Sequence, residues 1–240
     1  VITLRDPASL EELKKIGVTD KNALVTADPV LLVEGMPREA LVSLFAENGF
    51  PKEGRFFGIA VRDWQKNDAE FVRKIAKIAD FAAEKYGLIP LFLPMRFPND
   101  AALSEQISAC VKAKSYVLKK PVGVKDMIGL VGCSEAVLGM RLHTLIYAAG
   151  ASVPVIGVVY DRKVSAFLDY IGEKRRLDTE KIDVDAACRY LDEIMQDTGK
   201  ARTALSAEKE RLVLLAKENA KIAVGLLEDY DRSHACKNVK

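Results

Sequence analysis

Short apolar runs, rich in β-branched and aromatic residues, alternate along the chain with longer amphipathic stretches. Strands that are buried on both faces and joined by crossover helices give this pattern, so it predicts a parallel sheet wrapped by helices. The clearest helices are expected at residues 68–86 and 101–113. Strands are expected at residues 1–4, 22–26, 55–61, 88–94, 115–119, 135–139 and 153–160. The predicted fold class is therefore α/β.

Glycine and proline divide the chain into unequal parts. Residues 34–54, EGMPREALVSLFAENGFPKEG, carry both residue types near their ends and are expected to connect two sheets. Residues 1–33 offer only a strand, a helix and a strand, so we interpret them as the C-terminal remnant of an N-terminal domain that is largely missing from this chain. Residues 55–202 are expected to form a complete second domain. Residues 203–240 are expected to form a long helix and a tail that cross back to the first domain.

Charge and cysteine usage limit the classes of partner. Lys and Arg number 36 and Asp and Glu number 34, and the net charge of +2 predicts no nucleic-acid partner. The cysteines match no zinc-site spacing, so we expect reduced thiols in a cytoplasmic protein. They are Cys110, Cys133, Cys188 and Cys236. No apolar run approaches the roughly 20 residues that cross a bilayer, so any membrane contact is expected to be peripheral.

The candidate chemistry lies where the strand at 135–139 is followed by a helix. Gly139 and Arg141 fall in the loop at the carboxyl end of this strand, where open α/β sheets bind ligands. The start of the helix offers free N–H groups to an anion, and Arg141 adds a fork suited to phosphate or carboxylate. His143 adds a group that exchanges a proton near neutral pH. The two side chains converge only if Arg141 lies in the loop and His143 in the first helical turn.

A second polar loop follows the strand at 153–160. It supplies Asp161, Arg162 and Lys163, and the carboxyl ends of parallel strands meet at one edge of the sheet. Together the two loops predict a cationic pocket that contains a histidine. An ordinary helix cap, a structural histidine and solvated turn charges would explain the same residues without any function.

These two loops carry a resemblance to a known family. GMRLHTLIYAA at 139–149 and VPVIGVVYDRKVSAFL at 153–168 resemble the signature of the polysaccharide pyruvyl transferases, and the whole chain resembles the CsaB type, which modifies secondary cell-wall polymers of bacteria. The resemblance extends to VITLRDPAS at 1–9, TADPVLL at 26–32, GIAVRDW at 58–64 and LPMRFPND at 93–100.

The resemblance implies a glycosyltransferase-B-like fold with two Rossmann-like domains, in which residues 55–202 bind the donor. The implied reaction transfers the enolpyruvyl skeleton of phosphoenolpyruvate onto a sugar as a 4,6-ketal. For the CsaB type the implied acceptor is N-acetylmannosamine in a lipid-linked disaccharide. The protein would then work in the cytoplasm, at the inner face of the plasma membrane.

The resemblance and the chemistry of the residues together give the expected site. His143 is the expected catalytic residue. Phosphoenolpyruvate is expected to contact Arg5, Arg141, Leu142, His143 and Lys163, and the cleft is expected to be lined by Arg62, Asp100, Gly139 and Asp161. No metal and no cofactor are expected, because cationic groups can hold the phosphate and no carboxylate cluster suggests a magnesium site.

The sequence departs from the family's pattern at two places, and two other functions remain possible for these residues. Arg162 stands where the family usually has Pro, and the family's glycine-rich N-terminal opening is absent, so this chain alone is expected to bind the donor poorly. A glycosyltransferase that uses a nucleotide-sugar donor fits the same architecture. A non-catalytic glycan-binding module would favour exposed aromatic residues, yet Trp64 is the only tryptophan.

Overall fold

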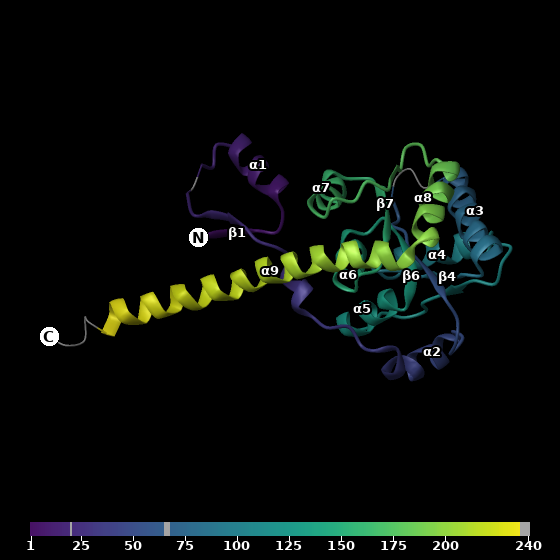
Figure 1. Cartoon of the computed structure of the whole chain (residues 1–240), viewed down its shortest axis with the longest axis horizontal. Helices are drawn as coiled ribbons and strands as arrows, with labels where there is room; N and C mark the ends of the chain where they lie inside the picture. Colours follow the sequence, from purple (N-terminus) through teal and green to yellow (C-terminus); the bar gives the residue numbers. More distant parts are fainter. Residues whose placement is uncertain (20, 65–67, 236–240) are drawn as a thin grey trace. The chain divides into compact units, whose positions relative to one another are not determined.

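The computed structural model describes residues 1–19, 21–64 and 68–235 (Figure 1). The chain divides into two compact units. Unit 1 combines Val1–Val33 with the chain from Lys209 onward, and unit 2 is Glu34–Glu208. The divisions therefore fall after residues 33 and 208, where the sequence suggested 33 and 202. The expected tail from residue 236, including Cys236, lies outside the described residues.

Unit 2 contains a six-stranded parallel sheet in the order β5-β4-β3-β6-β7-β8. The strands are β3 (Phe56–Ala60), β4 (Ile89–Phe92), β5 (Tyr116–Val117), β6 (Ser134–Gly139), β7 (Val155–Val159) and β8 (Arg176–Asp178). This is the order of a doubly wound dinucleotide-binding sheet, and the direction of winding reverses between β3 and β6. Residues of β3 and β6 are almost entirely buried, as expected of central strands covered on both faces.

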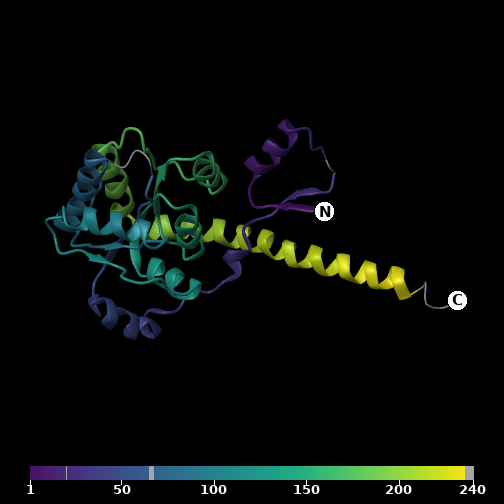
Figure 2. The ribbon, with the colours of Figure 1, turned by 180° about the vertical axis from the view of Figure 1, so that it is seen from behind.

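Two groups of helices cover this sheet. They are α3 (Ala69–Tyr86), α4 (Asn99–Ser108), α5 (Val124–Gly132), α6 (Leu142–Gly150), α7 (Arg162–Tyr170) and α8 (Val184–Gln196). Helix α3 packs against α4 and α8, and α6 packs against α5 and α7. Figures 1 and 2 show α3 and α8 side by side. Asp68 begins α3 by accepting hydrogen bonds from the backbone of Glu70 and Phe71, and Gly87 ends it with a φ of +63°.

The expected connection at 34–54 is itself structured and packed. It contains a 3₁₀ turn (Arg38–Leu41) and α2 (Val42–Asn48), and it belongs to unit 2. Phe45 is buried and meets Phe50 and Phe56 edge to face, with ring centroids 5.7 and 5.9 Å apart. Apolar burial of this kind explains why the segment is more than a linker.

Unit 1 pairs the start of the chain with the later part of its last helix. Strands β1 (Ile2–Leu4) and β2 (Ala23–Val25) form a parallel pair, joined by α1 (Pro7–Lys15). The last helix, α9 (Thr198–Ala235), begins five residues before the expected start at 203. Within unit 1, Asn219 of α9 accepts a hydrogen bond from the Thr26 hydroxyl and donates one to the carbonyl of Ala27, both at 3.0 Å.

Candidate functional site

The reversal between β3 and β6 places two loops next to each other at the carboxyl edge of the sheet in unit 2. The loop after β3 begins with Val61 and Arg62, and the loop after β6 contains Met140 and Arg141. The two loops touch, since the backbone N–H of Arg62 donates to the sulfur of Met140 at 3.4 Å. Ligands of doubly wound folds bind in the crevice at this point.

Arg141 and His143 occupy the start of α6. Arg141 is the N-cap residue, with an extended backbone (φ −81°, ψ 126°), and His143 is the second residue of the helix and is exposed. This local placement is the one under which the two side chains can converge. Leu142 between them is 6% exposed, so only its backbone can face a ligand.

The N-terminus of α6 is suited to an anion. The Arg141 side chain forms no capping hydrogen bond to the helix, and the Arg141 carbonyl accepts from the N–H groups of Thr144 and Leu145. The earlier N–H groups of a helix have no acceptor within it and lie at the positive end of its dipole. An anion in the loop would therefore meet backbone donors as well as side chains.

Asp100 and Gly139, both expected to line the cleft, are buried. Asp100 is fully buried near the start of α4 and pairs with Arg141. Gly139 is buried at the end of β6, and a Cβ added there would lie 2.6 Å from the Cδ2 atom of Leu145. Asp100 serves pairing and Gly139 serves packing beneath the surface, and a place in the cleft stays a prediction for both.

The loop after β7 and the first turn of α7 (Arg162–Tyr170) supply the second group of charges, so Lys163 lies in the helix and not in the loop where it was expected. Asp161 is the N-cap residue of α7 and accepts from the backbone N–H of Lys163 at 3.0 Å. The Lys163 ammonium lies 3.6 Å from the Asp161 carboxylate, and both side chains are more than a third exposed. It also lies 5.5 Å from the ring centroid of Tyr160. An exposed pair of this kind is weak, so the ammonium can exchange Asp161 for an anionic ligand.

A cationic and aromatic cluster joins the loops after β3 and β7, although β6 lies between these strands. Arg62 donates from Nη1 to the Tyr160 hydroxyl at 2.5 Å. Its guanidinium carbon lies 4.6 Å from the Tyr160 centroid and 5.0 Å from the Trp64 centroid. Cation–π contacts stabilise a cation without neutralising it. Sequence reasoning did not identify Tyr160, whose only signal was its position directly before Asp161.

Arg5 stands apart from this description because it belongs to unit 1. It follows β1, and its Nε atom lies 3.5 Å from the carboxylate of Asp6, which begins α1. Its approach to the donor stays a prediction.

The described residues give no sign of a metal centre or a membrane span. No group of three or more His, Cys, Asp and Glu side chains among them is arranged to hold a metal ion. None of their helices combines the length and the apolar character needed to cross a bilayer.

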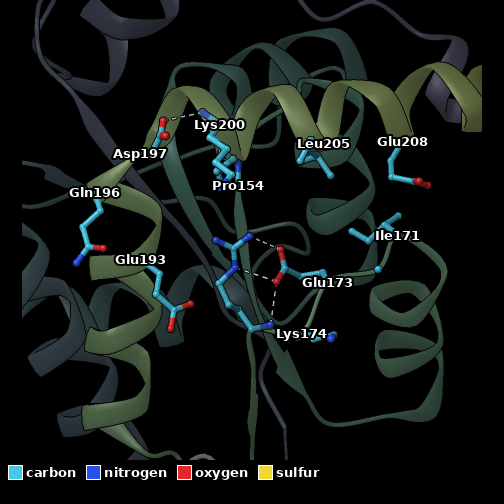
Figure 3. A pocket seen from close by; sticks show the side chains of 14 residues that line it. Pro154, Ile171, Glu173, Lys174, Glu193, Gln196, Asp197, Lys200, Leu205 and Glu208 are labelled. Carbon is cyan, nitrogen blue, oxygen red and sulfur yellow. Dashed lines mark hydrogen bonds and ion pairs between the residues drawn. The ribbon is translucent and has the colours of Figure 1, made fainter.

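A pocket of about 650 Å³ lies at the opposite, amino edge of the sheet (Figure 3). Pro154 and Arg175, which directly precede β7 and β8, contribute to its lining. Its acidic and basic side chains are mixed, and Arg175 is paired with Glu173. None of the expected site residues lines it.

Three solved structures with a similar fold bear the names of enzymes that act on sugars. A glycosyltransferase from Rickettsia africae matches with a TM-score of 0.62 and 14% identity, covering 94% of this chain and 63% of that one. UDP-GlcNAc 2-epimerase from Neisseria meningitidis matches with a TM-score of 0.67 and 12% identity, covering 92% and 60%. The chain thus spans about three fifths of the length of these proteins. The C-terminal domain of a group 1 glycosyltransferase from Francisella tularensis matches with a TM-score of 0.52 and 13% identity, covering 78% and 96%.

These likenesses define the fold, and a sequence comparison defines the family. The fold is the Rossmann-like α/β fold of GT-B glycosyltransferases. No curated protein matches the sequence significantly. The model of the family described as polysaccharide pyruvyl transferase matches residues 1–162, which include Arg62, Arg141 and His143 and end one residue before Lys163. The chain therefore belongs to the polysaccharide pyruvyl transferase family.

Proposed function

We propose that this protein transfers the three-carbon skeleton of phosphoenolpyruvate to two hydroxyls of a sugar as a pyruvyl ketal, with release of phosphate. The observation that carries the proposal is the start of α6, where Arg141 and the exposed His143 stand at the reversal point of the sheet. Family membership supports the same reaction class. Phosphoenolpyruvate carries a carboxylate and a phosphate, and such anions suit a helix N-terminus flanked by cations.

The proposed reaction needs one proton donor and a site that stabilises the departing phosphate. One sugar hydroxyl adds to C2 of the donor while C3 gains a proton, and a second hydroxyl adds to C2 as the C–O bond to phosphate breaks. The two hydroxyl protons balance the proton gained by C3 and the proton taken up by phosphate. His143 would hold or transfer the proton, a role worth about a hundredfold to ten-thousandfold in rate.

The positive side chains divide the remaining work. Arg141 precedes α6 and Lys163 lies in the first turn of α7, and the two side chains would hold the donor from two sides. Because these groups and the backbone of α6 can bind phosphate directly, the proposed mechanism uses no metal or cofactor.

We further propose the acceptor and the place of action. The resemblance to the CsaB type favours N-acetylmannosamine in a lipid-linked disaccharide of a bacterial cell wall, modified as a 4,6-ketal. The acceptor lipid would bring the protein to the inner face of the plasma membrane, as a peripheral contact.

The test compares donors in the natural protein with a lipid-linked disaccharide as acceptor. Phosphate release and a gain of the pyruvyl mass on the sugar are expected with phosphoenolpyruvate. Transfer of a sugar from a nucleotide-sugar donor, without reaction of phosphoenolpyruvate, would show instead a glycosyltransferase of the same fold. Binding of the glycan with no reaction of either donor would indicate a non-catalytic module.

A further inference from the structure

Asp100 is a carboxylate at the carboxyl edge of the sheet whose two oxygens both accept hydrogen bonds. Its side chain is fully buried, and each of its oxygens accepts two hydrogen bonds. Oδ1 accepts from Arg141 Nη2 at 2.5 Å and from the backbone N–H of Asp63 at 3.3 Å. Oδ2 accepts from Arg141 Nε at 2.8 Å and from the backbone N–H of Arg96 at 3.0 Å.

These four hydrogen bonds connect three loops that are far apart in the sequence. Asp63 follows β3, Arg96 follows β4 and Arg141 follows β6. The three strands are neighbours in the sheet, and β3 and β6 flank the reversal point. One carboxylate therefore fixes the loops on both sides of the proposed donor site.

The pairing also fixes which donors of Arg141 remain for a ligand. Nε and Nη2 form one edge of the planar guanidinium, and Asp100 takes this edge in a bidentate contact. Two hydrogens on Nη1 and one on Nη2 remain, and one hydrogen from each of these nitrogens forms the adjacent edge. The Arg141 side chain as a whole is 17% exposed, so it is not completely buried.

We propose that Asp100 is a positioning residue that orients Arg141 toward the donor. This inference rests on the proposed function for the identity of the donor. Asp100 itself touches no substrate. It acts by holding one edge of the Arg141 guanidinium so that the other edge is directed at the anion before the anion arrives, which lowers the cost of ordering on binding.

The chain offers a matched control for a buried carboxylate. Asp80 of α3 is 8% exposed, and one of its oxygens accepts from the backbone N–H groups of Lys112 and Ala113 at 2.8 and 3.1 Å. Asp80→Asn therefore perturbs a carboxylate that holds a loop but contacts none of the expected site residues.

The first measurement does not depend on the donor. The Nε–H group of Arg141 should give a nitrogen-edited NMR signal that exchanges slowly with water in the natural protein. Asp100→Asn should abolish this protection, and Asp80→Asn should leave it unchanged. An Arg141 signal that is equally protected in Asp100→Asn would overturn the proposal.

The second measurement is phosphoenolpyruvate affinity in a double-mutant cycle. Asp100→Asn and Arg141→Ala should each weaken binding about tenfold or more, and the double variant should be no weaker than Arg141→Ala alone, because Asp100 acts through Arg141. Losses that multiply in the double variant would overturn the positioning role, as would an equal loss of affinity in Asp80→Asn.

A third variant tests the orientation of Arg141 even if Asp100→Asn does not fold. Arg141→Lys keeps the charge and leaves Asp100 with a basic partner but removes the planar fork, so it should bind phosphoenolpyruvate nearly as weakly as Arg141→Ala. Affinity close to that of the natural protein would contradict a role for orientation. If the natural protein shows the protected Arg141 signal but does not bind phosphoenolpyruvate, the proposed function fails while the positioning of Arg141 by Asp100 stands.

Discussion

The two edges of the six-stranded sheet each hold an arginine in a bidentate pair with a carboxylate, and the two pairs connect very different parts of the chain. At the amino edge, Arg175 pairs with Glu173, only two residues away. At the carboxyl edge, Arg141 pairs with Asp100, 41 residues away, and the same carboxylate also holds two further loops. The first pair stabilises one turn, whereas the second organises a site.

The pocket at the amino edge and the candidate site at the carboxyl edge differ in their charges. The pocket of about 650 Å³ lies at the amino edge (Figure 3). Acidic and basic side chains are mixed in its lining: Glu173, Glu193, Asp197 and Glu208 with Lys174, Arg175 and Lys200. The carboxyl edge combines the start of α6 with Arg62, Arg141 and Lys163. Doubly wound sheets bind their ligands at the carboxyl edge. We therefore assign the site to the charged residues at this edge and not to the pocket at the amino edge.

The largest expected effect comes from His143. His143→Gln keeps a neutral hydrogen-bonding group of similar reach, so it should preserve the fold. It should lower turnover by at least about a hundredfold if His143 holds or transfers the proton that C3 gains. Phosphate release in the presence of the sugar acceptor measures this effect. A rate near that of the natural protein would mean that His143 has only a structural role.

The next effect contrasts the two edges directly. Arg141→Ala or Lys163→Ala should each cost about 1.5–3 kcal/mol of phosphoenolpyruvate binding, roughly tenfold or more in affinity, because each removes a charge-assisted contact. Lys200→Ala, which removes a cation from the amino-edge pocket, should leave the affinity unchanged. Calorimetric titration of the three variants would refute the assignment of the site if Lys200→Ala alone weakened binding.

A smaller effect is expected at Tyr160. Tyr160→Phe keeps the ring beneath Arg62 and Lys163 but removes the hydroxyl that accepts from Arg62. The loss of one hydrogen bond should cost about 1 kcal/mol, so phosphoenolpyruvate affinity should fall roughly fivefold. Tyr86→Phe is the matched control, since its hydroxyl donates to Asp192 between α3 and α8. Equal affinities in both variants would show that the hydrogen bond between Arg62 and Tyr160 does not contribute to donor binding.

The smallest effect lies away from both edges, at Asp192. Hydrogen bonds from Lys85 and then from Tyr86 lower the pKa of the Asp192 carboxyl. A lowered pKa in the folded protein stabilises it above the ordinary pKa of Asp, and this gain disappears as the pH falls through the lowered value. Asp192→Asn should lower Tm by no more than about 3 °C at neutral pH, because Lys85 is exposed and Asp192 is only partly buried. Thermal melts at neutral and strongly acidic pH should show this difference vanish in acid. A difference that persisted in acid would contradict the ionic origin.

The hydrophobic pattern was sufficient to predict the parallel sheet but not all of its strands. All seven predicted strands form, whereas β8 was missed. Its three residues, RLD, contain one buried side chain, Leu177, and no apolar run marks them. Pairing with β7 makes this segment a strand, so the information lies in tertiary structure.

The sequence predicted the local structure of the candidate site but not its long-range contacts. The local sequence correctly predicted a loop at Arg141 and a helix that begins at Leu142, because a strand, a loop and a helix follow one another there. Neither the pairing of Arg141 with Asp100 nor the contact of Arg62 with Tyr160 was predicted. Each joins residues dozens of positions apart, and only the strand order brings them together. Composition and spacing carry no information about such contacts.

The most direct test is a crystal structure with phosphoenolpyruvate bound. Phosphate or carboxylate oxygens should lie within hydrogen-bonding distance of the backbone at the start of α6, of the Arg141 guanidinium and of the Lys163 ammonium. The Arg141–Asp100 pair should remain intact beneath the ligand. Phosphoenolpyruvate bound in the pocket beside Arg175 and Lys200, with the start of α6 left empty, would contradict the account.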